Sequence, residues 1–332
     1  MNIKGDAPWL QPLLPCKFDN ASFWSSPEKL ARFVEEQGRD KAWYDCAWST
    51  EDPEWSGSKS MDHTLSMAKS GWPEGAERVS RIRDYVNATN PIRKNPIRYG
   101  FAGSVPSVPR AVAGDPKSMR LPTDSKNKRK PVITLIHNMG AYSYVTADAI
   151  NNRSAVVAAV IDQIEAAGFS VEVLAISPCT GWGVKSAYPS PIYGEAWRMC
   201  TTVLIKPSDQ PTDIGRLAFG LGQASMFRRL AFADRTLEPV CQKPLGSSMG
   251  STMQLTPNPE LTWKHVYLLP SNNVKLELFK DPAVAADQGS KWLINELKKQ
   301  RCPAFPGEAV KNKDDDDEED GLKIRLKSLG WW

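Results

Sequence analysis

The side chains best suited to chemistry in this chain are its three histidines, His63, His137 and His265. A histidine metal site usually brings such rings together through HxH or HExxH spacing, and neither spacing occurs here. His137 directly follows the apolar run 132–136, so it is expected where a buried strand meets its loop, the position at which parallel sheets hold ligands. A structural histidine is nevertheless the preferred interpretation for His137, and it is also preferred for His265, which falls within an apolar run.

The cysteines and glycines give weaker signals. No two cysteines form a CxxC pair, which favours free thiols in a reducing compartment over a zinc site. Neither a GxxxxGK[ST] phosphate loop nor a GxSxG nucleophile motif is present. We therefore assign no catalytic residue, no metal and no cofactor from the sequence. The scattered cysteines are Cys16, Cys46, Cys179, Cys200, Cys241 and Cys302.

The elements that must position His137 lie in residues 131–177. Residues 132–136 predict a strand, residues 146–167 predict a helix with an apolar face that stops at Gly168, and residues 171–176 predict a second strand. A strand–helix–strand unit implies a parallel sheet, and ligands bind such sheets at the carboxyl ends of the strands. The candidate partner-binding residues at that edge are His137, Asn138, Tyr142 and Ser143.

The rest of the chain supplies the remaining parts of an α/β fold. Further strands are expected at 201–205 and 263–269, and helices at 213–233, with a break near Gly220 or Gly222, and at 291–300. Residues 1–25 are expected to lie extended over the body. The predicted divisions are a helical, loop-rich and Trp-rich N-terminal region at 1–125, a Rossmann-like α/β domain with a parallel sheet at 131–302, and a disordered acidic tail with a terminal docking peptide at 303–332.

Charge is distributed unevenly along the chain. The net charge is +4, but residues 314–320 are all acidic, so residues 1–313 carry about +8. A body of that sign can attract nucleic acid, with the acidic run as an internal competitor. A mildly basic protein without any nucleic-acid role is the alternative. The candidate nucleic-acid-binding residues are Lys126, Lys128, Arg129, Lys130, Arg228 and Arg229.

The strand–helix–strand unit resembles a von Willebrand factor A-like domain. In that fold the loop after the first strand usually reads DxSxS and holds a divalent metal. Here His137, Met139 and Ala141 stand at those three positions, so the resemblance implies a Rossmann-like fold whose metal site is lost. The segments that carry the resemblance are 132–143, 152–161 and 167–173.

The chain also resembles an uncharacterised family of proteins from tailed bacteriophages and their prophages. The resemblance rests on the order of several short segments, and it implies a phage origin and a fold without implying a reaction. The segments are 71–76, 108–116, the strand–helix–strand unit, 216–219 and 226–232.

Three functions remain open from the sequence. The leading hypothesis is a non-enzymatic interaction or assembly factor of a phage, which holds a phage or host protein at the strand-end face. The second is an accessory protein that binds single-stranded nucleic acid in phage replication or transcription, and the third is an enzyme of unknown class with its site at His137 and the loop 179–183. No run approaches the roughly 18 apolar residues of a membrane span, and the start lacks the apolar core of a secretory signal. We therefore expect the host cytoplasm, with packaging in the virion left open.

Overall fold

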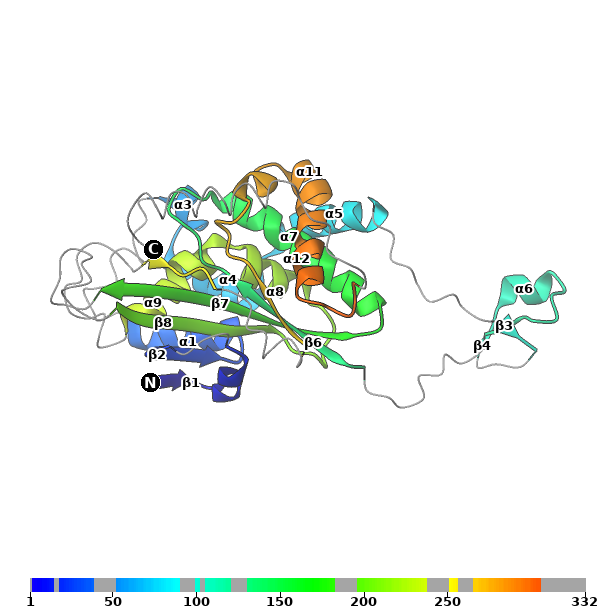
Figure 1. The fold of residues 1–332 in the computed structure, drawn as a ribbon, viewed down its shortest axis with the longest axis horizontal. Helices are drawn as coiled ribbons and strands as arrows, with labels where there is room; N and C mark the ends of the chain where they lie inside the picture. The colour runs from blue at the N-terminus through cyan, green and yellow to red at the C-terminus, as the bar shows by residue number, and fades with distance from the viewer. Residues whose placement is uncertain are drawn as a thin grey trace.

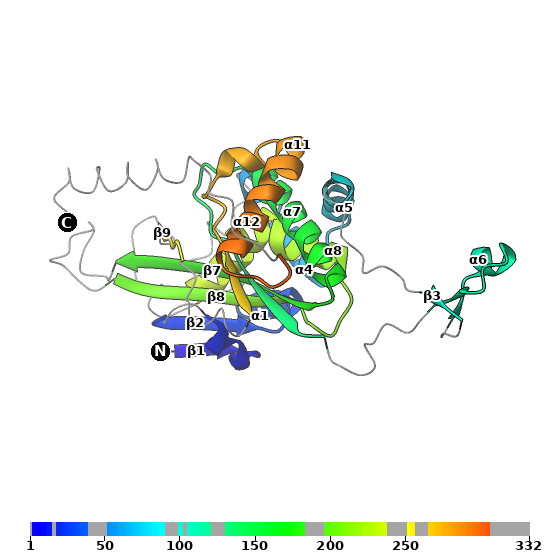
Figure 2. The ribbon, with the colours of Figure 1, turned by 45° about the vertical axis from the view of Figure 1, so that its right-hand side comes forward.

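A mixed β-sheet forms the centre of the protein (Figures 1 and 2). In this computed structural model the strand order, among the described residues, is β1-β2-β8-β7-β6-β10, and β9 pairs with β7. The strands are β1 (Asn2–Gly5), β2 (Asn20–Trp24), β6 (Val132–Asn138), β7 (Ser170–Trp182), β8 (Ala196–Lys206), β9 (Ser251–Thr252) and β10 (Val266–Leu269). The structure describes residues 2–14, 18–38, 52–89, 99–101, 105–120, 130–182, 196–237, 251–255 and 265–305.

The strand–helix–strand unit predicted from the sequence is confirmed. β6 and β7 are parallel neighbours joined by α7 (Ala147–Ala166). The side chain of Thr146 accepts a hydrogen bond from the Ala149 amide at the start of α7, and Gly168 has a φ of +98° just after its end. These are the N-cap and the left-handed stop that fix the length of the helix. The carboxyl end of β6 therefore lies where the sequence predicts it.

The sheet is mostly parallel, and the pairing of β8 corrects the expectation of a parallel sheet throughout. β8 lies antiparallel to β7, whereas β10, β6 and β7 form one parallel set and β8, β2 and β1 form another. A parallel crossover normally needs a helix between the strands. Residues 183–195, which join β7 to β8, are rich in Pro, Gly and Ser and carry no helical pattern. Because the sequence of this connection predicts no crossover helix, it favours the antiparallel pairing of β7 and β8.

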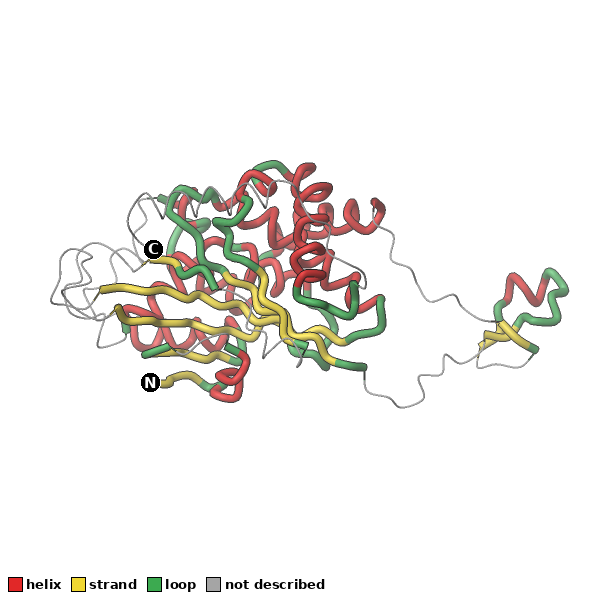
Figure 3. The backbone as a smooth tube through the Cα atoms, in the orientation of Figure 1, coloured by secondary structure: helices red, strands yellow, loops and turns green. Residues whose placement is uncertain are grey.

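The N-terminal segment contributes to the same sheet. Residues expected to lie extended over the body form β1 and β2, which add to the outer side of β8. A second sheet of three short strands with one helix lies within residues 99–120 (Figure 3). Its elements are β3 (Tyr99–Gly100), β4 (Val105–Pro106), α6 (Val108–Val112) and β5 (Met119–Arg120). Residues 121–129, at the predicted boundary between the N-terminal region and the α/β domain, and the tail beyond Phe305 lie outside the described residues.

The two faces of the main sheet are covered differently. One face carries the larger core, in which alternate strand residues such as Leu135 and Val173 pack against the helices, and Figure 2 shows the helical layer on that side. The other face carries a smaller core that includes Ile136 and Leu174 of the central strands and Leu10 of the 3-10 helix η1 (Pro8–Leu13). The longer helices of the layer are α1 (Pro27–Gly38), α4 (Met61–Ser70), α5 (Pro73–Thr89), α7 and α12 (Ser290–Lys299).

Short helical turns complete the helical layer. The helix predicted at 213–233 is interrupted at Gln223, whose extended backbone separates two π-helical turns. His265 is exposed and has a φ of 58° just before β10, so it is not the mid-strand residue that the sequence predicts. No helix in the described part of the chain is both long and apolar enough to cross a membrane. The short elements are α3 (Pro53–Ser56), α8 (Ile214–Leu217), η3 (Ala218–Gly222), η4 (Met226–Ala231), α9 (Phe232–Thr236), η5 (Leu276–Phe279), α11 (Pro282–Val284) and η6 (Ala285–Gly289).

The side chain of Gln300 forms hydrogen bonds with the backbone of Leu268 at the outer edge of β10. Its Oε1 accepts from the Leu268 amide at 2.9 Å and its Nε2 donates to the Leu268 carbonyl at 2.7 Å, so the amide group replaces a neighbouring strand. Because both backbone groups are buried, we expect Gln300→Ala to lower the free energy of unfolding by about 1–3 kcal/mol in urea denaturation. Lys299→Ala is the control, since Lys299 neighbours Gln300, is 41% exposed in its ion pair with Glu296 and should cost less than about 1 kcal/mol when replaced. Equal effects of the two substitutions would contradict the edge role of Gln300.

Candidate functional site

His137 lies at the carboxyl end of β6 and is fully buried. It follows Leu135 by two residues and therefore faces the helical layer. Burial lowers the pKa of His137 well below its ordinary value, the nearby charge of Arg153 lowers it further, and the Leu221 backbone opposes this. The imidazole is therefore neutral and closed to solvent, so a partner cannot touch it.

Asn138 is also buried, and it shapes the turn that leaves the strand. Its Oδ1 accepts from the Gly140 amide at 3.0 Å, and its Nδ2 donates to the Met253 carbonyl at 3.1 Å. A Cβ at Gly140 would lie 2.1 Å from Thr252 Cγ2, so only glycine fits against β9 at this position. Of the four residues predicted to bind a partner, His137 and Asn138 are thus internal, and Tyr142 and Ser143 are exposed.

The loop that follows, residues 139–145, has almost all of its carbonyls engaged by distant donors. Such dense anchoring leaves a surface loop few alternative conformations, because each change of conformation breaks a hydrogen bond. The acceptor and donor pairs are Met139 O with Asn272 Nδ2 (3.1 Å), Gly140 O with Asn272 N (3.0 Å), Ala141 O with Thr252 Oγ1 (3.4 Å), Tyr142 O with Arg228 Nη2 (3.2 Å), Ser143 O with Trp55 Nε1 (2.9 Å) and Val145 O with Arg228 Nη2 (2.6 Å).

Arg228 is the main anchor of this loop. Its guanidinium is buried, donates to the carbonyls of Tyr142 and Val145, and also donates to the Trp55 carbonyl. It lies 4.5 Å from the centre of the Trp55 ring, which is cation–π distance. Burial lowers the pKa of Arg228 to about 10, against the charge of Asp52, so the group stays charged at neutral pH. The side chain of Arg228 therefore lies inside the protein and is closed to a surface partner.

This placement corrects the proposed nucleic-acid surface at Arg228 and Arg229. Arg229 is buried as well, and it donates to the hydroxyls of Ser56 and Ser58 at 2.9 and 2.8 Å. A phosphate cannot reach either guanidinium without unfolding these contacts. Of the other basic candidates, Lys130 is exposed. Lys126, Lys128 and Arg129 lie outside the described residues.

Arg153 of α7 supports the opposite side of the loop through Asn272, a role that no sequence pattern predicted. Its guanidinium donates to Asn272 Oδ1 at 2.9 Å and to the Pro270 carbonyl, and it lies beside the Phe279 ring. Burial lowers its pKa to about 9, which leaves it protonated at neutral pH. Asn272 in turn holds Met139 and Gly140. The only sequence signal was the polar run 151–154 inside an otherwise apolar helix.

The anchored loop presents two aromatic rings to solvent. Tyr142 is 42% exposed and Tyr144 is 67% exposed, and their ring centroids are 5.4 Å apart. The amide of Tyr142 donates to Asn273 Oδ1 at 2.6 Å, which fixes its backbone from a third direction. The neighbouring Trp55 is partly exposed. A rigid pair of tyrosines is suited to packing against another molecule, because little freedom is lost when they are covered.

The charges around this surface are mainly acidic on the side of α3. Asp52 and Glu54 both precede Trp55 in the chain and are exposed. Asp148 at the start of α7 is exposed and pairs with Arg78 at 2.6 Å. Carboxylates repel a phosphate backbone. The local charge therefore favours a protein over a nucleic acid at the tyrosine pair.

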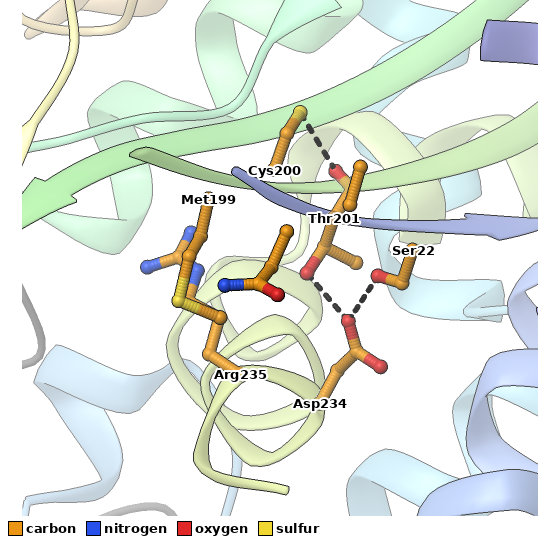
Figure 4. Close-up of a pocket in the computed structure, with 8 residues that line it drawn as sticks. Ser22, Met199, Cys200, Thr201, Asp234 and Arg235 are labelled. Atoms are coloured by element: carbon orange, nitrogen blue, oxygen red, sulfur yellow. Dashed lines mark hydrogen bonds between the residues drawn. The ribbon is translucent and has the colours of Figure 1, made fainter. Parts of the chain in front are cut away.

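A second group of polar side chains lies between the main sheet and α9 (Figure 4). Lys4, Ser22 and Thr201 are register partners on β1, β2 and β8. The carboxylate of Asp234 accepts from the hydroxyls of Ser22 and Thr201, the latter at 2.6 Å, and its Oδ1 lies 3.2 Å from the Lys4 ammonium. The cavity beside it has a volume of about 10 Å³, far less than the roughly 300–1,000 Å³ of ligand pockets. We interpret this group as the tether that holds β1 to the body.

The enzyme hypothesis places its site at His137 and the loop 179–183, where the described side chains of His137 and Cys179 are both buried. Cys179 is buried, and burial raises the pKa of its thiol against the charge of Arg235, so the thiol stays protonated at neutral pH. Residues 183–195 lie outside the described chain. In the part of the chain that the structure describes, no three His, Cys, Asp or Glu side chains are grouped to hold a metal ion. Met139 and Ala141, at the metal-loop positions of the resemblance, are buried.

Comparison with known proteins gives one family match. A family model described as a domain of unknown function (DUF7192) matches residues 18–281. This range runs from the start of β2 past β10 and includes the anchored loop, Arg153 and Arg228. No curated protein and no solved structure matches the chain.

Arg228→Lys tests the anchoring of the loop. Lysine keeps the charge but cannot donate to three carbonyls in the planar arrangement of arginine. We expect the amides of residues 139–145 to exchange with solvent at least tenfold faster in hydrogen-exchange measurements, with a loss of about 2 kcal/mol in the free energy of unfolding. Arg229→Lys is the comparison variant, because it weakens contacts to Ser56 and Ser58, which are not part of the loop, so loop exchange should rise much less than in Arg228→Lys. Similar loop exchange in both variants would refute the anchor role.

The burial of His137 gives a pH dependence with a defined sign. In the unfolded chain the imidazole binds a proton near pH 6.5, whereas in the folded protein it does so only at a much lower pH. Unfolding therefore takes up a proton below pH 6.5, and the free energy of unfolding falls by up to about 1.4 kcal/mol per pH unit as the pH drops. This contribution should be absent in His137→Gln. Parallel curves of unfolding free energy against pH for the two proteins would mean that His137 is not held neutral.

Proposed function

The chain belongs to the family described as a domain of unknown function (DUF7192), and we propose that it is a non-enzymatic protein-binding module. The observation that carries this proposal is the pair Tyr142 and Tyr144, exposed on a loop whose backbone is held by side chains from three other parts of the chain. A partner packs over the two rings. His137 and Asn138 shape the site from inside without touching the partner.

The energetic argument is one of preorganisation. Tyrosine is enriched at the centres of protein interfaces, where truncation of a well-packed ring typically costs at least about 2 kcal/mol of binding free energy. Binding loops usually lose part of that gain in becoming ordered. Here the donors from Arg228, Asn272 and Trp55 have already ordered the loop in the free protein. The buried arginines thus contribute to binding without contacting the partner.

We retain two finer parts of the proposal. The first is that the β6–α7–β7 unit is a von Willebrand A-like domain without a metal, supported by the parallel pairing of β6 and β7 and by the position of the loop after β6. The second is a phage origin, which rests on the order of the short segments within residues 71–232 and makes the partner a phage or host protein in the host cytoplasm.

A peptide-display selection on the full chain tests the tyrosine pair. Ligands from a random library of about twelve residues should bind the Tyr142→Ala/Tyr144→Ala variant at least tenfold more weakly than the wild type in fluorescence anisotropy, a loss of about 1.4 kcal/mol or more. Tyr85→Ala is the matched control, because it removes a tyrosine of similar exposure from α5. The unfolding free energies of all three proteins should agree within about 0.5 kcal/mol.

Two results would count against the proposal. The first is a set of ligands that bind the double variant as tightly as the wild type. The second is tight binding of labelled single-stranded DNA that weakens steeply between low and high salt and is lost in the double variant, because base stacking on the tyrosines would then explain their exposure.

A further inference from the structure

The positive charge of the chain is concentrated in one stretch, residues 90–130. This stretch contains ten Lys or Arg and two Asp, a net charge of +8. Because residues 1–313 as a whole carry about +8, basic and acidic residues balance each other in the rest of that range. A net charge of this size in so short a stretch creates a local field that attracts polyanions. A polyanion that approaches the protein is therefore drawn to residues 90–130 first.

A small folded unit lies inside this stretch. It consists of the three-stranded sheet and α6 in residues 99–101 and 105–120, and we call it the β3–β5 unit (Figure 3). The Ser107 amide donates to the Ser118 carbonyl at 2.7 Å, which ties α6 to the sheet. Among the described side chains of the unit only Ser107 is buried, and its described residues belong to neither core of the main sheet. Packing of the main fold therefore does not account for its surface side chains.

Two aromatic rings of the β3–β5 unit are placed to stack with other rings. Tyr99 on β3 and Phe101 just after it are two residues apart, so the alternation of a strand directs both side chains to one face. Phe101 is 74% exposed and Tyr99 is partly exposed. Unpaired bases stack on exposed rings of this kind with little regard to sequence, because every base has a π-face.

A cation accompanies each ring. The guanidinium of Arg110 lies 4.1 Å from the centre of the Tyr99 ring, and the ammonium of Lys117 lies 5.7 Å from the centre of the Phe101 ring. Arg110 Nη1 also donates to the Lys117 carbonyl at 3.5 Å, so the two ring–cation pairs are neighbours. Asp115, the one acidic residue in the sequence of the unit, lies 3.5 Å from Arg110, whereas the Lys117 side chain is exposed. Rings that alternate with cations are typical of surfaces that bind single-stranded nucleic acid.

We propose that the β3–β5 unit binds single-stranded nucleic acid, with bases stacked on Tyr99 and Phe101 and a phosphate at Lys117. The other basic residues of 90–130 strengthen the attraction through their field, which acts without direct contact. A duplex fits less well, because its bases are already stacked on one another. This function is additional to protein binding at Tyr142 and Tyr144 and does not depend on it.

Two other occupants of the β3–β5 unit would use different side chains. A protein partner would pack on α6, where Val108 is 66% exposed and Val112 is 83% exposed. The acidic run 314–320 has the charge to compete for the cations, but it contains no ring that could stack. The contribution of the Phe101 ring therefore distinguishes a nucleic acid from both.

Fluorescence anisotropy of the full-length protein with labelled single-stranded DNA of about sixteen nucleotides tests the proposal. We expect Phe101→Ala to weaken binding at least about fivefold, and Phe101→Trp to keep it within about twofold because bases stack on indole as well. Val112→Ser is the matched control, since it changes an exposed side chain of the same unit that has no ring. Lys117→Gln should reduce the slope of log affinity against log salt concentration by about 0.7, the value for one phosphate contact.

Three results would overturn the proposal. The first is equal binding by the Phe101→Ala and Phe101→Trp variants, and the second is a duplex of the same length that binds as tightly as the single strand. The third is an absence of binding both by the wild type and by a full-length variant with residues 314–320 replaced by Asn and Gln. Binding that tightens in that variant and is lost again with Phe101→Ala supports the proposal and makes the acidic run a competitor.

Two further titrations identify the strand and separate this site from the tyrosine pair. RNA of the same length shows which strand is preferred, and either strand bound more tightly than the duplex supports the proposal. The Tyr142→Ala/Tyr144→Ala variant should bind the DNA as the wild type does, whatever its effect on peptide ligands. DNA binding that is lost in that variant but kept in Phe101→Ala would place the stacking at the other tyrosines and overturn the assignment to the β3–β5 unit.

Discussion

The buried guanidinium of Arg228 is the interaction on which the candidate site depends. An ion removed from water is stable only when its hydrogen-bonding groups find partners, and here the partners are the carbonyls of Tyr142, Val145 and Trp55 together with the Trp55 ring. The same contacts that keep Arg228 charged in the interior therefore fix the loop and α3 relative to each other. The hydrogen bonds that stabilise the buried Arg228 are therefore the same ones that fix the geometry of the surface loop.

The helix α7 explains how so much polar chemistry can lie inside the protein. It is buried between the sheet and the other helices, and its residues 151–154 are polar. Among these residues, Arg153 donates hydrogen bonds to Pro270 and Asn272 just after the end of β10. The loop after β6 is thus held by two buried arginines. Arg228 of η4 holds it directly, and Arg153 of α7 holds it through Asn272. A surface built in this way stays in one conformation, which is what an interface of few residues requires.

The local parts of this architecture follow from the sequence. The apolar runs and the 3.6-residue periodicity predict β6, α7 and β7, because these patterns depend on neighbouring residues only. They also place the loop after β6 at the edge of the sheet, and with it Tyr142 and Ser143. The antiparallel pairing of β8 and the addition of β1 and β2 do not follow in the same way, since strand pairing joins residues far apart in the chain and leaves no local pattern.

The roles of individual residues divide in the same way, into those that local sequence predicts and those that contacts between distant residues decide. The sequence by itself determined which strand end carries the candidate site, and that His137, Met139 and Ala141 at this strand end offer no side-chain oxygen ligands. Only the tertiary structure decided that His137 and Asn138 are internal, and that Arg228 and Arg229 hold the protein together instead of facing nucleic acid. The physical reason is distance along the chain. Arg228 donates to a carbonyl 83 residues away, and whether a cation faces water or a buried acceptor depends on where the fold brings that acceptor.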